Sequence, residues 1–173
     1  MGRHAQPSGD DLLLTDWRSD RLGAARRGDN PLVMAKLNSG YAVFGDTQHL
    51  PGYCVLLSDV DGADHLTDLT RAQRTDFLND MGLLGEAVFA ACNGFDPAFR
   101  RLNYEILGNS LHQLHAHIHP RYSWEAREFR DGPVWRYPNE VRLSADNDTL
   151  VSTRAEEFDQ LREAITAELA RLA

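Results

Sequence analysis

Histidines concentrate in one short segment of this 173-residue chain, at a spacing that suggests chemistry. Four of the seven histidines fall within eight residues, at positions 112, 115, 117 and 119. Side chains alternate between the two faces of an extended strand, so one face would carry Gln113, His115, His117 and His119. Neighbours on that face lie about 7 Å apart, so one imidazole can attack a phosphorus atom while the next hydrogen-bonds the same phosphate. The pattern favours phosphate chemistry.

Metal binding is the main alternative for this cluster, because neutral imidazole is a common ligand of Zn²⁺ and Ni²⁺. The cluster has no nearby cysteine and no carboxylate at a familiar zinc spacing. It matches neither His-Glu-x-x-His nor a paired Cys-x-x-Cys site. A solvated strand without function is the third possibility. The isolated histidines, at positions 4, 49 and 65, are expected to be structural or surface residues.

The residues around the cluster resemble a known motif. Residues 108–121 combine Gly-Asn-Ser, the alternating histidines and a closing Pro-Arg. This series resembles the motif of the histidine triad family of nucleotide hydrolases and transferases. Upstream, residues 40–44 and 53–57 look like the family's paired strands around a turn, here Pro51-Gly52, that contacts the nucleotide. Within the family the chain is most similar to bacterial proteins described as diadenosine tetraphosphate hydrolases, which share a Gly-Pro-Val-Trp series like that at 132–135.

Two registers of the triad can be drawn, and the Pro-Arg pair at 120–121 decides between them. Aligning that pair with the family places the three triad positions at Gln113, His115 and His117. The alternative, which runs through His119, makes Pro-Arg arrive two residues early. In the adopted register a glutamine replaces the first histidine, while His112 and His119 are additional.

The resemblance assigns a role to each triad position. His115 would be the nucleophile that attacks the α-phosphorus of a nucleotide, forming a nucleotidyl-histidine that water cleaves. Its ring must be neutral, which adjacent imidazoles favour because two nearby rings are not easily both charged. His117 would hold a phosphate oxygen or protonate the leaving group. Gln113 would orient its neighbours, with an altered rate or specificity.

Further residues are assigned to the substrate. Ser110, with backbone N–H groups of the turn at Gly108 and Asn109, would stabilise charge on the departing phosphate. The alternative for Asn109 and Ser110 is a simple turn. Asp46 would bind ribose hydroxyls, and His119 would add a contact to the substrate. Arg121 would grip phosphate or would be solvated at the strand end.

Composition limits the class of protein. The length fits one domain, with residues 1–14 as a loose N-terminal segment and 15–173 as a single histidine-triad-like domain. Eighteen basic and twenty-six acidic residues give a net charge of −8, which disfavours nucleic-acid binding. An anionic substrate must therefore be met locally, by the histidines, Arg121, backbone N–H groups and any Mg²⁺ carried with the substrate.

Cellular location also follows from composition. The two cysteines, Cys54 and Cys92, are expected to be reduced thiols in the core. No apolar run approaches the ~20 residues needed to cross a membrane, and the first dozen residues lack the hydrophobic region of a signal peptide. We therefore expect a cytoplasmic protein without a membrane partner.

Local patterns predict an α+β fold with an antiparallel sheet, a long crossover helix and a C-terminal helix. Thr70-x-x-Gln73 caps the long helix, which ends near Asn93-Gly94. Thr153-x-x-Glu156 opens the C-terminal helix, whose apolar face carries Phe158, Leu161, Ile165 and Leu169. Residues 101–107 read as a strand joined to the histidine strand by a tight turn, and a shorter helix is expected over 16–26. Trp135 is expected to pack against the sheet rather than stack on a base.

Together these features predict a nucleotide hydrolase that cleaves dinucleoside polyphosphates, or related nucleotidyl conjugates, through a covalent intermediate on His115. A nucleotidyltransferase or phosphorylase of the same family is the first alternative. A nucleotide-binding or metal-binding protein without catalysis is the second, because of Gln113. The resemblance also implies a homodimer.

Overall fold

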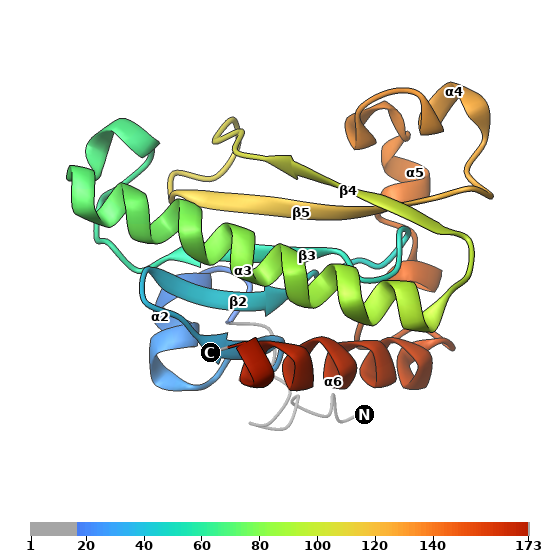
Figure 1. Cartoon of the computed structure of the whole chain (residues 1–173), viewed down its shortest axis with the longest axis horizontal. Helices are drawn as coiled ribbons and strands as arrows, with labels where there is room; N and C mark the ends of the chain where they lie inside the picture. The colour runs from blue at the N-terminus through green and yellow to red at the C-terminus, as the bar shows by residue number, and fades with distance from the viewer. Residues whose placement is uncertain (1–16, 173) are drawn as a thin grey trace, which may run out of the picture.

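Five antiparallel strands form one sheet in the computed structural model, which describes residues 17–172 (Figure 1). The strand order is β1-β2-β3-β5-β4. The strands are β1 (Val33–Lys36), β2 (Gly40–Phe44), β3 (Cys54–Ser58), β4 (Phe99–Glu105) and β5 (His115–Tyr122). The two long helices are α3 (Arg71–Phe95) and α6 (Ala155–Leu172). Short helices are α2 (Arg21–Arg27), α4 (Arg127–Arg130) and α5 (Asn139–Arg142), with single 3₁₀ turns at Leu66–Asp68, Val134–Arg136 and Ala145–Asn147.

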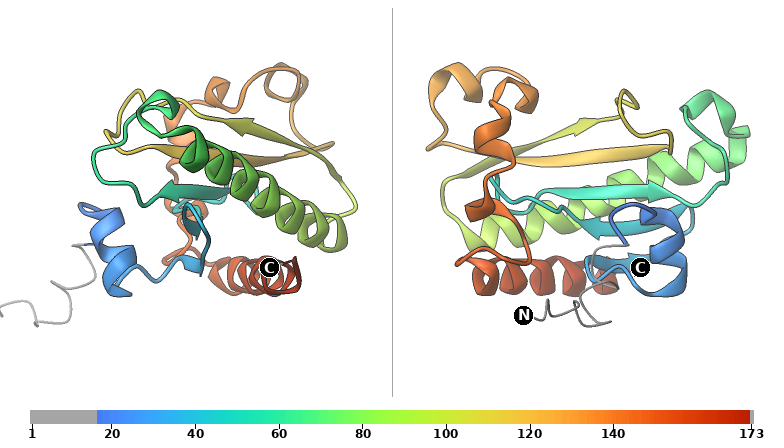
Figure 2. Two further views of the ribbon diagram at one scale, coloured as in Figure 1. Left: turned by 60° about the vertical axis from the view of Figure 1, so that its left-hand side comes forward. Right: turned by 180° about the vertical axis from the view of Figure 1, so that it is seen from behind.

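The sheet has a helix-covered face and an open face. Helices α3 and α6 lie on one side, whereas α2 and the chain from about 134 to 148 lie on the other (Figures 1 and 2). Even-numbered residues of the three central strands point to the helices and are fully buried, in the rows Ala42–Leu56–Ala116 and Phe44–Cys54–Ile118. The strand period of two therefore sends the odd-numbered histidines of β5 to the open face.

Both long helices form as the sequence predicts. Thr70 and Gln73 make the reciprocal capping box at the start of α3. The predicted apolar face of α6 is buried, with all four of its residues at 2% exposure or less. The start of α6 differs, because the helix begins at Ala155 and Ser152, rather than Thr153, accepts a hydrogen bond from the Arg154 N–H. The α+β fold class is confirmed.

Several local predictions are corrected. The strand expected over 101–107 is β4, which ends at Glu105, and nine residues rather than a tight turn connect it to β5. Strand β1 carries no clear alternation and was not predicted. The helix expected over 16–26 begins at Arg21, where Asp20 accepts from the Gly23 N–H, and ends at Arg27, before Gly28 in the left-handed conformation. The expectation for residues 1–14 lies outside the described residues.

Both cysteines lie in the core, as expected. Cys54 and Cys92 are buried free thiols between the sheet and α3. Within residues 17–172 no helix is long and apolar enough to cross a membrane.

Candidate active site

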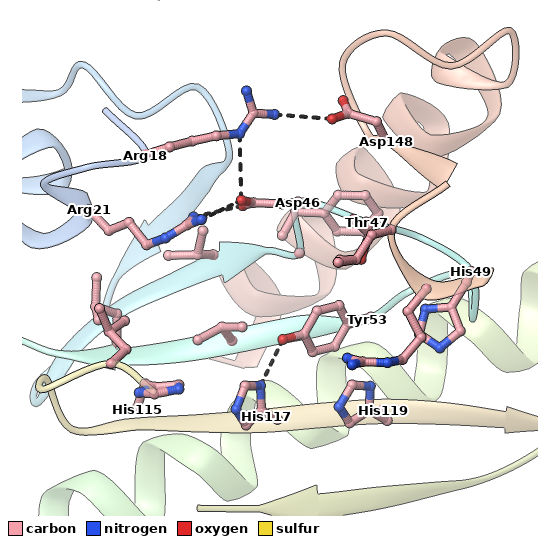
Figure 3. A pocket seen from close by; sticks show the side chains of 18 of the residues that line it. Arg18, Arg21, Asp46, Thr47, His49, Tyr53, His115, His117, His119 and Asp148 are labelled. Carbon is pink, nitrogen blue, oxygen red and sulfur yellow. Dashed lines mark hydrogen bonds and ion pairs between the residues drawn. The ribbon is translucent and has the colours of Figure 1, made fainter. Parts of the chain in front are cut away.

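A cavity of about 460 Å³ opens on the face of the sheet that α3 and α6 leave uncovered. Its floor consists of side chains from adjacent strands, including the row Val43–Val55–His117. Arg18, Arg21 and the segment 135–148 close its sides (Figure 3). A single cavity therefore joins three of the expected site residues on β5, namely His115, His117 and His119, with Asp46.

His115 lies at one end of the histidine row and is only partly buried. Its Nδ1 lies 2.7 Å from the backbone carbonyl oxygen of Gln113. A carbonyl can only accept, so Nδ1 carries the proton and Nε2 keeps its lone pair. The local backbone therefore gives His115 the tautomer that a nucleophile at Nε2 requires.

Gln113 lies outside the cavity lining and contacts its neighbours through both its backbone carbonyl and its side chain. The strand begins only at His115, and the Gln113 amide donates to the carbonyl oxygens of Ser58 and Val60 at the end of β3. The prediction that Gln113 extends the imidazole face is wrong, because residue 113 precedes the regular ladder. The glutamine fixes the start of β5, and its carbonyl orients His115.

Tyr53 determines the state of His117. The Tyr53 hydroxyl lies 2.7 Å from His117 Nδ1. Burial raises the pKa of Tyr53 above its ordinary value, so the phenol keeps its proton and donates it. Burial, with the neighbouring His115, lowers the pKa of His117 to about 4. His117 is therefore neutral at pH 7, accepts at Nδ1 and carries its remaining N–H on Nε2.

The loop before β3 holds Tyr53 in place. The buried Gln48 side chain donates to the carbonyl oxygens of Gly45 and Tyr53 and accepts from the Gly52 N–H. The Pro51-Gly52 turn faces the core, where a Cβ on Gly52 would lie 2.4 Å from the Cys92 Sγ. The expectation that this turn contacts the nucleotide is corrected, since the next residue, Tyr53, lines the cavity instead.

Asp46 lines the cavity as expected, within an ion-pair network. Arg21 binds both of its carboxylate oxygens, at 2.8 and 2.6 Å, and Arg18 lies 3.6 Å away. Arg18 also reaches Asp148, at 3.4 Å. The network therefore links Arg21 of α2, through Asp46 and Arg18, to Asp148 on the other side of the cavity (Figure 3).

Arg121 is not available to phosphate, contrary to the prediction. Its side chain is 3% exposed and pairs with the fully buried Glu125. Nε and Nη2 donate to that carboxylate, while the remaining N–H groups donate to Asn103 and to the carbonyl oxygens of Phe129 and Gly132. All five N–H groups thus have protein acceptors. Arg121 anchors the chain that follows β5.

The turn expected to stabilise the leaving group does not reach the cavity. Gly108 takes the left-handed conformation, with φ of +64°, and Asn109 and Ser110 are exposed. The lining includes Leu111 instead. The nine residues between β4 and β5 form no strand. The expected tight turn, which would have held these residues next to the histidine strand, is therefore absent.

The far end of the histidine row combines His119, for which a substrate contact is predicted, with residues that were not expected to line the site. His119 is 1% exposed, and its ring stacks on Tyr53 at 4.2 Å between centroids. His49, expected to be structural or on the surface, also lines the cavity. Trp135 packs its edge against His117 and His119, as expected of a packing residue, but it also lines the cavity. Arg142 lies over the indole, 4.7 Å from its centroid.

We expect Tyr53→Phe to lower kcat by about 10- to 100-fold and the free energy of unfolding by about 1–3 kcal/mol. The ring would still stack on His119, but the hydroxyl that fixes the His117 tautomer would be lost, and one well-placed hydrogen bond contributes about 1–3 kcal/mol. Steady-state kinetics and thermal unfolding of the variant would test this. Tyr41→Phe is the matched control, because Tyr41 lies on the neighbouring strand β2 outside the cavity lining. A Tyr53→Phe variant with unchanged kcat would refute the assignment.

Comparisons with known proteins bear on the fold. No family model matches the chain, and no curated protein matches its sequence. Among solved structures, a histidine triad protein from Marinobacter aquaeolei VT8 superposes with a TM-score of 0.65 at 21% identity, covering 89% of this chain and 96% of that one. A histidine triad protein from Bradyrhizobium japonicum has a TM-score of 0.64 at 19% identity, covering 84% and 95%. A zinc-bound histidine triad family protein from Mycobacterium smegmatis has a TM-score of 0.55 at 15% identity, covering 86% and 91%.

Fold and histidine strand together define an α+β protein that carries a row of imidazoles in an open-face cavity. Its fold is that of the histidine triad proteins, which confirms the resemblance seen in the sequence at the level of the fold. Within residues 17–172 no group of three or more histidine, cysteine or acidic side chains is arranged to hold a metal ion.

Proposed function

We propose that the protein is a nucleotide hydrolase that cleaves dinucleoside polyphosphates, such as diadenosine tetraphosphate, or related nucleotidyl conjugates. The observation that carries the proposal is the hydrogen bond from His115 Nδ1 to the Gln113 carbonyl, which leaves Nε2 free to attack. The neighbouring His117, with an N–H on Nε2, supports it. Their ring centroids are 4.7 Å apart, close enough for both rings to engage one phosphate.

The reaction would proceed in two displacements. His115 Nε2 attacks the α-phosphorus, a P–N bond forms, and the P–O bond to the leaving group breaks with its electron pair on the departing oxygen. The His115 ring becomes cationic, and its Nδ1–H bond to the Gln113 carbonyl stabilises that charge. Water then attacks the phosphorus and loses a proton to solvent, the P–N bond breaks, and the nucleoside monophosphate leaves.

The remaining lining residues suit a nucleoside. Val43, Val55, Leu57 and Leu111 supply an apolar surface for a base. Asp46 is our candidate for the ribose hydroxyls, since a carboxylate oxygen bound by Arg21 still has a lone pair that can accept. His117 Nε2–H is the candidate donor to a non-bridging oxygen of the α-phosphate.

Product analysis tests the proposal. The protein is incubated with diadenosine tetraphosphate, with and without Mg²⁺ and with and without inorganic phosphate. AMP and ATP formed without added phosphate would support hydrolysis. Products of ADP and ATP that require phosphate would indicate a phosphorylase instead. If no product forms in any mixture, hydrolysis of dinucleoside polyphosphates is rejected.

A further inference from the structure

The cavity extends well past the two histidines used above. Figure 3 places His115 at one end of the row and His119 with His49 at the other. Three residues of strand separate His115 from His119, and the ring of His117 between them lies 4.7 Å from the His115 ring and 5.7 Å from the His119 ring, measured between centroids. A single phosphate held at His115 and His117 would leave the far end of the cavity unused.

The imidazole nitrogens at the far end have no hydrogen-bond partner within residues 17–172. No hydrogen bond from the described residues reaches either ring nitrogen of His119, although this side chain is almost fully buried and lines the cavity. The same holds for both ring nitrogens of His49. Buried polar atoms are costly to leave unpaired, so such nitrogens are expected to bind a polar group that enters the cavity.

Arg142 adds a positive charge at this end. Its Nε and Nη2 donate to Tyr137 and Asn139, and among the described residues no carboxylate pairs with it. The other cavity arginines, Arg18 and Arg21, are paired with Asp46 and Asp148. Among the arginines that line the cavity, Arg142 is therefore the one without a carboxylate partner within residues 17–172. A guanidinium group forms strong hydrogen bonds with phosphate oxygens.

Reaction geometry links this end to the leaving group. In phosphoryl transfer the attacking and leaving atoms lie roughly in line with the phosphorus. Attack from His115 therefore directs the leaving group away from it, along the row toward His119. We infer that His49, His119 and Arg142 form a second anion subsite, which binds the phosphate groups of a polyphosphate leaving group. This inference rests on the proposed function and specifies its substrate class.

The state of His117 agrees with a phosphate leaving group. A neutral imidazole with its N–H on Nε2 can donate a hydrogen bond, but it does not provide a readily transferred proton as imidazolium does. Amines and alkoxides need such a proton to depart. A polyphosphate departs as an anion, so it requires charge stabilisation of the kind that Arg142 offers.

Binding measurements separate this subsite from catalysis. Calorimetry compares AMP, which has one phosphate, with ATP, in the wild-type protein and in the variants Arg142→Gln and His119→Phe. The phenylalanine keeps the ring that stacks on Tyr53. We expect wild type to bind ATP more tightly than AMP, and each variant to weaken ATP binding by about tenfold or more while AMP binding changes less than about threefold.

Arg136→Gln is the matched control, since Arg136 lies in the same segment but outside the cavity lining. Equal losses for AMP and ATP, no loss in the Arg142→Gln variant, or a wild type that binds ATP no more tightly than AMP would each overturn the inference. Because these are equilibrium measurements, they decide the subsite even if diadenosine tetraphosphate is not hydrolysed. Conversely, turnover without the selective loss would leave the hydrolase proposal intact and remove the subsite.

Discussion

His115→Ala is expected to lower kcat for diadenosine tetraphosphate by at least about 10³-fold. Without an imidazole at this position no covalent intermediate forms, and loss of a nucleophile in covalent catalysis typically costs several orders of magnitude. Binding of AMP should weaken by no more than about tenfold, since a neutral ring contributes roughly one hydrogen bond. Rapid-quench kinetics and calorimetry would measure the two quantities separately.

The neighbouring His112 offers a control of the same residue type. Its side chain is 90% exposed, bonds to Asp64 and lies outside the cavity lining. His112→Ala should therefore leave kcat within about twofold of wild type, in line with the small effects of most exposed substitutions. A His115→Ala protein that retained most of the activity would exclude the nucleotidyl-histidine route.

Residues whose placement depends on local periodicity could be predicted from the sequence. The alternation 115–117–119 fixes the face of the imidazoles once the segment is a strand, and the Thr70 capping box fixes the start of α3. Both depend on interactions within a few residues of the chain.

Residues whose role depends on tertiary contacts could not be predicted in this way. Arg21, at the start of α2, and Arg18, in the turn before it, reach the cavity from almost a hundred residues before the histidine strand. Tyr53 is an intermediate case. It shares the alternation of Val55 and Leu57, and that signal would have placed it on the histidine face, but the sequence does not reveal its bond to His117.

Arg121 illustrates how a motif can suggest the wrong role. A family pattern and a net charge of −8 both favoured a phosphate ligand, because an anionic substrate needs local positive charge. In the structure Arg142 lines the cavity, whereas Arg121 is buried and binds Glu125. The four-residue spacing of Arg121 and Glu125 is only a weak signal of an ion pair, because outside a helix two such side chains meet only where the chain turns.

Replacement of Arg121 is expected to cause a large loss of stability without a catalytic defect. Arg121→Ala should lower the free energy of unfolding by about 3–5 kcal/mol, because the fully buried Glu125 carboxylate would lose its counter-charge. Tyr137 and the Tyr122 N–H would still donate to it, but neither carries charge. Urea unfolding would measure the loss, and kinetics at low temperature would measure kcat per folded molecule.

Arg101 provides the comparison, since it lies directly across from Arg121 on β4 and is exposed. Arg101→Ala should change the free energy of unfolding by less than about 0.5 kcal/mol. The double variant Arg121→Met with Glu125→Leu should recover much of the stability lost in Arg121→Ala, because it removes both charges and keeps apolar volume. If Arg121→Ala were instead stable and its KM for the nucleotide rose sharply, the arginine would be a substrate ligand after all, and the motif-based assignment would be restored. The two assignments therefore differ in which quantity changes, stability or KM, and one variant decides between them.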